Sequence, residues 1–153
     1  ALSRFLEVRD EAGEAHARLA LAVAAAFGER LDEAKVGFQE TIKIWKSLGA
    51  EQMAAYGQMN LAELLLLQDE PEAAEALLLE ATAQFTEHAD PAGQGSALSL
   101  LGRARLQKGL TAEAEALQRD ALKLSWELHD IQATAGILDA LAETMDRKPA
   151  RTN

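Results

Sequence analysis

The run GQGS at residues 93–96 is the part of this sequence that most invites a chemical interpretation. Glycine-rich loops can cradle a phosphate with backbone N–H groups when a strand precedes them and a lysine follows. Neither condition holds here, because no strand-like run comes before residue 93 and no lysine comes directly after residue 96. Asp90 and Pro91 stand just upstream and are typical of an N-cap and the first residue of a helix. We therefore expect Gly93 and Gly95 in the opening turns of a helix, in positions for small residues, and not at a nucleotide site.

The histidines and carboxylates form no recognisable catalytic or metal-binding pattern. His16, His88 and His129 are too scattered for a metal site by local spacing, and the last two fall near predicted helix ends, where an imidazole interacts favourably with terminal carbonyls. The acidic run at residues 69–72 is typical of a turn followed by an acidic first helical turn. There is no cysteine, and no nucleophile-elbow, zinc-protease or Walker pattern occurs. We expect a non-enzymatic protein with no catalytic residues, no metal and no cofactor.

Composition indicates a helical protein in solution. The 153 residues are 48% hydrophobic and 26% charged, alanine and leucine dominate, and β-branched residues are scarce, which favours helices in a globular chain. The net charge of −10 argues against direct contact with nucleic acid, whose phosphates need clustered Lys and Arg. Apolar stretches such as residues 19–27 are too short to span a bilayer, and no signal peptide is visible. We expect a cytoplasmic location and no membrane partner.

An internal repeat with a period of about 40 residues organises the chain. Positions separated by one period, called columns below, hold the same or similar residues: one column is Leu21, Leu61, Leu101 and Leu141, and another is Ala34, Ala74 and Ala114. Each unit contains two stretches with the apolar spacing of a helix. The first, helix A, is predicted over residues 11–27, 51–68, 91–108 and 131–145. The second, helix B, is predicted over residues 32–48, 71–88 and 111–128.

Stacking of these helix pairs defines the expected fold. An isolated pair cannot bury both its faces, so neighbouring pairs share one continuous core, and small residues in the Ala34 column let the helices approach closely. The sequence predicts an all-α fold, a right-handed superhelical array of antiparallel helix pairs, which is an α-solenoid of about three and a half repeats. The repeats are expected at residues 10–49, 50–89 and 90–129, within a single domain of residues 1–147.

The beginning of the chain departs from the full repeat. Residues 1–9 align with residues 121–129, and Phe5 shares an aromatic column with Trp45 and Phe85. We therefore expect residues 1–9 to form the second half of an earlier helix B. A chain that starts inside a repeat, without Met at its first position, indicates a piece of a longer protein.

The end of the chain is expected to close the array. Residues 130–147 are predicted to form an unpaired A helix that acts as a cap. Its polar surface is expected from Thr134, Asp139, Glu143 and Asp146. Pro149 stops this helix, and residues 148–153 are expected to be a disordered tail. The two tryptophans, Trp45 and Trp126, fall in B helices and are expected in the core.

These columns resemble the tetratricopeptide repeat family over nearly the whole chain. The family has a Leu-Gly or Leu-Ala pair in helix A and two small residues in helix B. The pair is matched by Leu21-Ala22, Leu61-Ala62, Leu101-Gly102 and Leu141-Ala142, and the small residues by Ala74, Ala81, Ala114 and Ala121. The period is longer than the standard unit of about 34 residues. Longer units are typical of large bacterial signalling ATPases, of LuxR-type transcription regulators and of scaffold proteins that clasp peptides or helices.

The resemblance implies that the A helices line a concave groove. The groove positions, carried over residue by residue, are His16, Leu19, Val23, Tyr56, Met59, Glu63, Ser96, Ser99, Arg103, Asp139 and Glu143. This mixture suits an amphipathic helix or an extended peptide. Tyr56 and Met59 are either anchors for that ligand or residues that pack against neighbouring helices, and Arg103 could pair with a partner carboxylate. The clamp of chaperone-tail binders is absent, since Arg103 alone among the eight corresponding positions is a cation.

Three functions stay open on the sequence. The first is a non-enzymatic protein–protein interaction module that binds a peptide or helix in the concave groove. The second is a sensory or regulatory domain of a multidomain bacterial transcription regulator or signalling ATPase, in which the groove accepts a small effector or an intramolecular partner. The third is structural: the N-terminal edge, with Leu2, Phe5 and Leu6, packs against another copy or a further repeat.

Overall fold

The repeat predicts the helices of the structure closely. The structure is a computed structural model, and it describes residues 2–147. Its helices are α1 (Leu2–Phe27), α2 (Leu31–Ser47), α3 (Glu51–Leu67), α4 (Pro71–Glu87), α5 (Pro91–Gln107), α6 (Thr111–Glu127) and α7 (Ile131–Asp146). Apart from the start of α1, every predicted boundary lies within one residue of the observed one. The tail expected at residues 148–153 lies outside the described residues.

One turn geometry joins all consecutive helices. The middle residue of each three-residue turn has a left-handed backbone, as at Gly49, where φ is 69°, and at Ala89, where φ is 51°. The next N–H then reaches back to the helix, so that Asp90 N donates to Phe85 O at 2.8 Å, which is the Schellman pattern of helix ends. Helices α2 to α6 each have 17 residues. Two such helices with their turns make up one period of the repeat.

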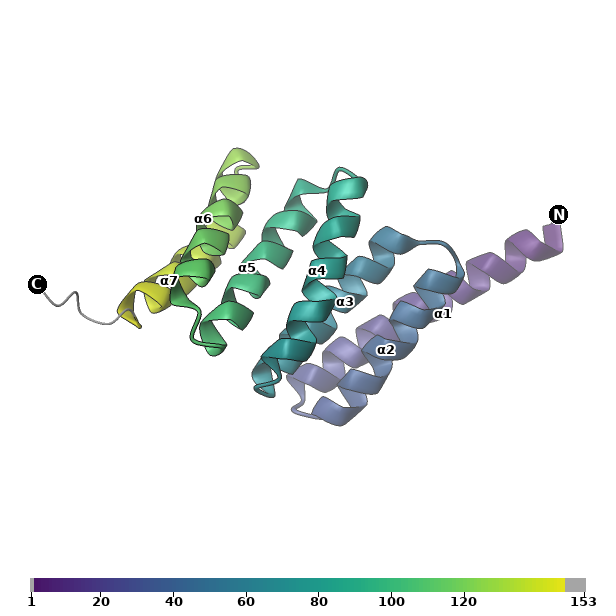
Figure 1. The fold of residues 1–153 in the computed structure, drawn as a ribbon. Coiled ribbons are helices and arrows are strands. Elements are labelled where there is room, and N and C mark those ends of the chain that lie inside the picture. Colours follow the sequence, from purple (N-terminus) through teal and green to yellow (C-terminus); the bar gives the residue numbers. More distant parts are fainter. Residues whose placement is uncertain (1, 148–153) are drawn as a thin grey trace, which may run out of the picture.

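Consecutive helices pack against one another along the whole array. Direct packing also joins consecutive A helices, α3 with α5 and α5 with α7. Figure 1 shows the resulting row of helix pairs, with α1 at one end of the row and α7 at the other. The predicted fold class is thereby confirmed as an all-α solenoid of helix pairs.

Small residues bring the two helices of each pair together. Ala34, Ala74 and Ala114 are completely buried, as their shared column predicts. Between α1 and α2, a Cβ placed on Gly37 would lie 2.8 Å from the Cβ of Ala22. Close packing of this kind excludes larger side chains from the column.

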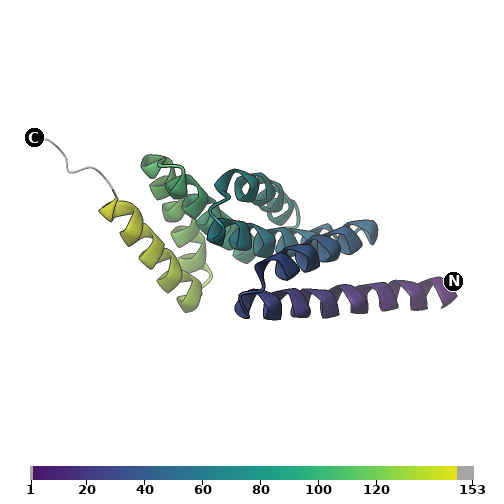
Figure 2. The same cartoon turned by 90° about the horizontal axis from the view of Figure 1, so that it is seen from below.

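The N-terminal half-helix expected at residues 1–9 is wrong. Helix α1 continues without a turn through Asp10, from Leu2 to Phe27, and Figure 2 shows its purple end running on in line beyond the other helices. A continuous helix satisfies its backbone hydrogen bonds, whereas a separate nine-residue helix without a packing partner is unstable.

Only one of the two tryptophans belongs to the core. Trp45 is buried as expected, but the expectation for Trp126 is wrong, because its side chain is 73% exposed. The aromatic column of Trp45 and Phe85 continues in Ser125, which is buried in its place. Trp126 is one residue further on, and about 100° round the helix, so it points away from the core.

The glycine run is a helix start, as predicted. Gly93 and Gly95 are buried in the opening turns of α5, whose first residue is Pro91. Asp90 caps this helix, because its Oδ1 accepts a hydrogen bond from Gly93 N at 2.9 Å. The phosphate-loop interpretation is therefore excluded by the local geometry.

Candidate binding surface

Tyr56 connects two repeats and does not stand free in a groove. Its hydroxyl donates to Asp90 Oδ2 at 2.6 Å, and its ring meets the edge of Phe85 with the centroids 4.8 Å apart. Gln52 Nε2 donates to the same carboxylate oxygen at 2.9 Å. Tyr56 and Gln52 lie on α3, whereas Asp90 caps α5. We call this group of hydrogen bonds the Asp90 clip, and it holds consecutive A helices together.

The clip shifts the pKa of both its acidic partners. Burial raises the pKa of Tyr56 to about 12, together with its hydrogen bond to the Asp90 carboxylate and the charge of that carboxylate. Burial alone would raise the pKa of Asp90 as well. Hydrogen bonds from Tyr56, from the Gly93 N–H and from Gln52 outweigh it and hold that pKa below the ordinary value.

These shifts predict how the clip depends on pH. The folded pKa of Tyr56 is raised, so its contribution is complete below about pH 10, the unfolded value, and is lost as pH rises toward 12. The folded pKa of Asp90 is lowered, so its contribution is complete above about pH 4 and is lost in more acidic solution. We expect the difference in urea-unfolding free energy between the wild type and Tyr56→Phe to be constant from about pH 5 to 9 and to shrink on both sides. A difference that does not change with pH would contradict the clip.

The column of Leu19, Met59 and Ser99 faces the partner helices. Leu19 and Met59 are partly buried and pack against the main hydrophobic cluster. Ser99 Oγ donates to Gln118 Oε1 of α6 at 3.1 Å, and Gln118 Nε2 donates to Ser99 O at 2.9 Å. In the structure, Tyr56 and Met59 therefore pack against neighbouring helices. Ser99 likewise bonds to another helix of the chain, through Gln118.

Two other predicted positions lie on α1 and α5, outside the columns described above. His16 is exposed, with its Nδ1 2.9 Å from Ala12 O and its ring edge-on to Trp45 at 4.8 Å. Ser96 lines a shallow hollow at the junction of α5, α6 and α7. His88 behaves as predicted for a helix end, since its Nδ1 is 2.9 Å from Gln84 O.

The column of Val23, Glu63, Arg103 and Glu143 reaches the surface. Arg103 Nη1 lies 3.3 Å from Glu63 Oε1 and joins α5 to α3, so its guanidinium already has an acidic partner. Glu143 pairs with Arg147 at 2.7 Å, and Asp139 is exposed.

A largely apolar hollow lies between α1 and α3, beside these predicted positions. It has a volume of about 300 Å³ and is lined by Val23, Ala26, Phe27, Phe38, Asn60, Glu63, Leu64 and Leu67. Phe38 of α2 is buried, so it lies at the bottom, and Phe27, at 88% exposed, stands at the rim with the exposed Leu67. We call this the α1–α3 hollow.

Of the predicted residues, only Val23 and Glu63 line the α1–α3 hollow. Phe27 and Leu67 were missed by the sequence reasoning, although they share a column, because in the third and fourth repeats that column holds Gln107 and Arg147. The sequence signal that could have identified them is that this column is apolar in the first two repeats only, at Phe27 and Leu67.

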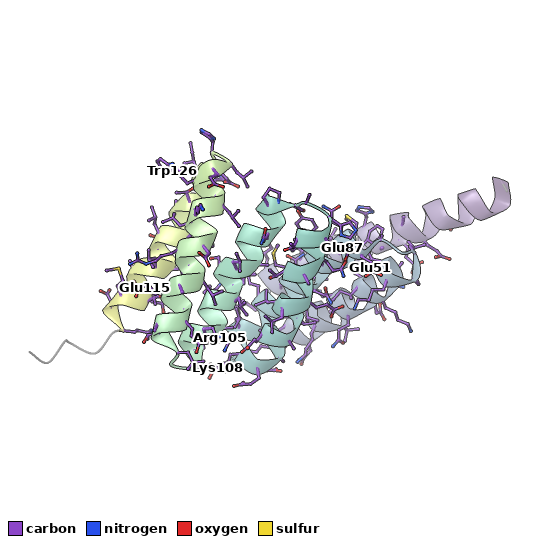
Figure 3. The ribbon with its side chains drawn as sticks, turned by 45° about the horizontal axis from the view of Figure 1, so that its top comes forward. Glu51, Glu87, Arg105, Lys108, Glu115 and Trp126 are labelled. Carbon is purple, nitrogen blue, oxygen red and sulfur yellow. The ribbon has the colours of Figure 1, made fainter. Side chains whose placement is uncertain are left out.

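Arg105 and Lys108 are engaged in a partly buried network of ion pairs. Glu75 of α4 is only 15% exposed and pairs with Arg105 at 2.6 Å and with Lys108 at 2.7 Å. Figure 3 shows Arg105 and Lys108 together near the end of α5. Arg105 also meets Glu113 of α6 at 3.1 Å. The network ties α4, α5 and α6 together.

The N-terminal edge of the array is open among the described residues. Leu21 is 69% exposed, whereas Leu61 and Leu101 of the same column are each 5% exposed, because an earlier repeat covers them. The side chains of Leu2, Phe5 and Leu6, which we expected at this edge, lie outside the described residues. Self-association through the edge stays a prediction. Separately, none of the described helices is both long enough and apolar enough to cross a bilayer.

Comparison with known proteins supports the fold only. No family model matches the chain, and no curated protein matches it either. Among solved structures, the crystal structure of BtubC (BKLC) from P. vanneervenii has a TM-score of 0.77 at 21% sequence identity. The match covers 87% of this chain and 56% of that one, so this chain spans little more than half of its neighbour's length. Such a likeness shows that the two share an all-helical backbone arrangement.

Proposed function

We propose that this chain is a tetratricopeptide-like module that binds a helix or an extended peptide of another protein. The observation that carries the proposal is the α1–α3 hollow, where Phe27 and Leu67 are exposed around a cavity of about 300 Å³. Grooves that pair apolar pockets with a few polar groups are the usual sites for peptide side chains.

The lining defines the chemistry of the ligand. An apolar side chain would fill the hollow against Val23 and Leu64, and burial of Phe27 would add about 2 kcal/mol. Asn60 and Glu63 border the same hollow and offer an amide and a carboxylate to the N–H groups of a peptide. The expected ligand is therefore a segment with a large apolar residue beside a donor or cationic group.

The proposal is tested with a displayed library of random peptides selected against the wild-type chain. Selected peptides are then measured by fluorescence anisotropy against the double variant Phe27→Ser with Leu67→Ser. Loss of two apolar contacts should weaken binding by roughly tenfold or more.

The matched control is the double variant Leu21→Ser with Leu79→Ser, since both leucines are exposed and neither lines the hollow. It should bind the selected peptides as the wild type does. Equal affinity for the wild type and the Phe27/Leu67 variant would remove the hollow as the binding site.

A further inference from the structure

The final helix, α7, exposes an apolar stripe with an acidic border. The stripe consists of Ile131, Ala135, Leu138, Ala142 and Met145, all of them exposed, and their spacing of four and three residues sets them on one side of the helix. In the described part of the chain α7 packs against α5 and α6, and neither covers this side. Asp139 and Asp146 follow the stripe one residue further round the helix and are exposed as well.

Both alanines of the stripe stand in columns that a B helix covers elsewhere in the array. Helix α6 covers these columns in α5, because a Cβ added to Gly102 would lie 3.2 Å from Ala114 O and one added to Gly95 would lie 3.8 Å from Ala121 O. The covering helix therefore has two small residues seven positions apart, which let the two backbones approach closely. The equivalents of Ala135 and Ala142 in the other A helices are all buried: Ala15, Ala55, Gly95, Ala22, Ala62 and Gly102.

The α5–α6 pair also shows which position of a covering helix meets the column of Asp139. Ser99 stands in that column, and its Oγ donates to Gln118 Oε1 of α6 at 3.1 Å. A helix that lies on α7 as α6 lies on α5 would therefore present its equivalent of Gln118 to the Asp139 carboxylate. Asp146 stands in the column of Leu106, near the end of α5 where α6 begins. It would meet the N-terminal turn of the covering helix, whose dipole favours a carboxylate.

These two carboxylates distinguish α7 from the other A helices. None of the ion pairs among the described residues includes Asp139 or Asp146, and Arg147 of the same helix is already paired with Glu143 at 2.7 Å. A carboxylate that is covered without a partner is costly, so a helix on this face has to supply the positive charge. In the other A helices the same two columns hold only uncharged residues: Leu19, Met59, Ser99, Ala26, Leu66 and Leu106.

The B helices of this chain do not have the required charge. The position that meets the Asp139 column is Phe38 in α2, Leu78 in α4 and Gln118 in α6. None of these residues is a cation, whereas an exposed Asp139 is best complemented by Lys or Arg. The occupant therefore shares the small residues of a B helix but differs from the described B helices in charge.

From this combination we infer that α7 is a docking face for a basic amphipathic helix of another protein. The helix lies antiparallel to α7, with small residues opposite Ala135 and Ala142 and with Lys or Arg opposite Asp139. Its N-terminal turn lies beside Asp146. An amphipathic helix that lays its apolar face against an apolar surface is a recurrent mode of recognition.

A second apolar feature adjoins the stripe at the start of α7. Trp126, His129, Ile131 and Thr134 line a hollow of about 320 Å³, and Ile131 belongs to both the stripe and the hollow. Trp126 is 73% exposed, and Figure 3 shows it near the end of α6. The C-terminal end of the docked helix arrives here, so a large apolar side chain at that end gains contact with Trp126.

The probe for this face is a peptide of residues 111–127, the sequence of α6, changed at one position. One form carries Gln118→Lys and the other Gln118→Glu, so the two differ only in the charge presented to Asp139. A staple joins the exposed positions 112 and 116, because an isolated helix of this length is marginal in water. Each peptide is labelled, and its binding to the chain is measured by fluorescence anisotropy.

Charge reversal tests the position of the peptide. The wild type should bind the Gln118→Lys peptide more tightly than the Gln118→Glu peptide by roughly fivefold or more, and the variant Asp139→Lys should reverse this order. Asp120→Lys is the matched control, since it changes the net charge equally at an exposed position of α6; it should keep the wild-type order. An unchanged order in Asp139→Lys, or no binding of either peptide up to about 1 mM, would overturn the inference.

Apolar substitutions test the stripe itself. Leu138→Ser should weaken binding of both peptides by roughly fivefold, whereas Leu79→Ser should not, although Leu79 is equally exposed, at 51% against 48% for Leu138. The double variant Phe27→Ser with Leu67→Ser should bind both peptides as the wild type does. Its failure to bind them would move the peptides to the α1–α3 hollow and overturn the inference. The two surfaces are separate, so neither proposal depends on the other.

Two further results would assign the stripe to a different occupant and so overturn the inference. The first is a dimer in sedimentation equilibrium that is lost in Leu138→Glu, which would identify a second copy as the occupant. The second is peptide binding to this chain that is lost in a longer natural form of it, which would identify a helix of that same protein. We expect a chain whose sedimentation is unchanged by Leu138→Glu, and peptide binding that is kept in any longer form.

Discussion

Asp90→Ala is expected to lower the free energy of unfolding by about 3 kcal/mol. The carboxylate caps α5 through Gly93 N and accepts hydrogen bonds from Tyr56 and Gln52 of the preceding A helix. Loss of an N-cap costs about 1 kcal/mol. The substitution also leaves the half-buried hydroxyl of Tyr56 without its charged acceptor, which costs about 2 kcal/mol more. Urea denaturation followed by circular dichroism measures the change.

Asp130→Ala is the matched control. Asp130 stands in the same column and caps α7 through Ala133 N at 2.9 Å. In the preceding A helix, α5, however, Ala92 and Ser96 stand where α3 has Gln52 and Tyr56. It should therefore lose only the cap, about 1 kcal/mol. If both substitutions cost the same, the hydrogen bonds of Tyr56 and Gln52 contribute nothing to stability.

Gly93→Ala should destabilise the protein by about 2 kcal/mol, although alanine favours a helix over glycine by about 1 kcal/mol. A Cβ at this position would lie 2.5 Å from Cδ1 and 2.7 Å from Cε1 of Phe85. The Phe85 ring is fully buried and its edge rests on Tyr56, so it has no free space to enter. Overpacking therefore outweighs the gain in helix propensity.

Two other glycines in A helices serve as controls, because alanine there gains helix propensity without the close contact to Phe85. Gly95 is two residues further along the same helix, and the nearest atom to its added Cβ is Leu124 Cβ at 3.4 Å. Gly13 shares a column with Gly93, and an added Cβ meets nothing within 4 Å. Alanine at either position should be neutral or stabilise by up to about 1 kcal/mol. A Gly93→Ala protein as stable as Gly95→Ala would show that the Phe85 contact can relax.

Much of the fold could be predicted because its determinants are local. The apolar period, the prolines at residues 71 and 91 and the turn between each pair of helices act within a few residues of the chain. They predict the helix boundaries of α2 to α7 within one residue and place Gly93 in a helix start. The small column of Ala34, Ala74 and Ala114 also predicts that these alanines are buried, since identical units stack in identical ways.

The candidate site could be predicted only in part, because it depends on how neighbouring helices are placed. The sequence identifies Val23 and Glu63 but not Phe27 and Leu67, since the depth of the hollow depends on the spacing of α1 and α3. The role of Tyr56 likewise depends on the position of a carboxylate 34 residues away.

The sequence by itself determined the architecture: a repeating unit, its two helices, and the small residues on which they pack. Periodicity and turn chemistry are enough for this, because each helix is specified by residues close to it in the chain. Only the tertiary structure decided which polar side chains are used up in the Asp90 clip, that Trp126 is exposed, and that α1 is continuous. These outcomes depend on how residues of different helices meet in space, which the local pattern of the sequence does not specify.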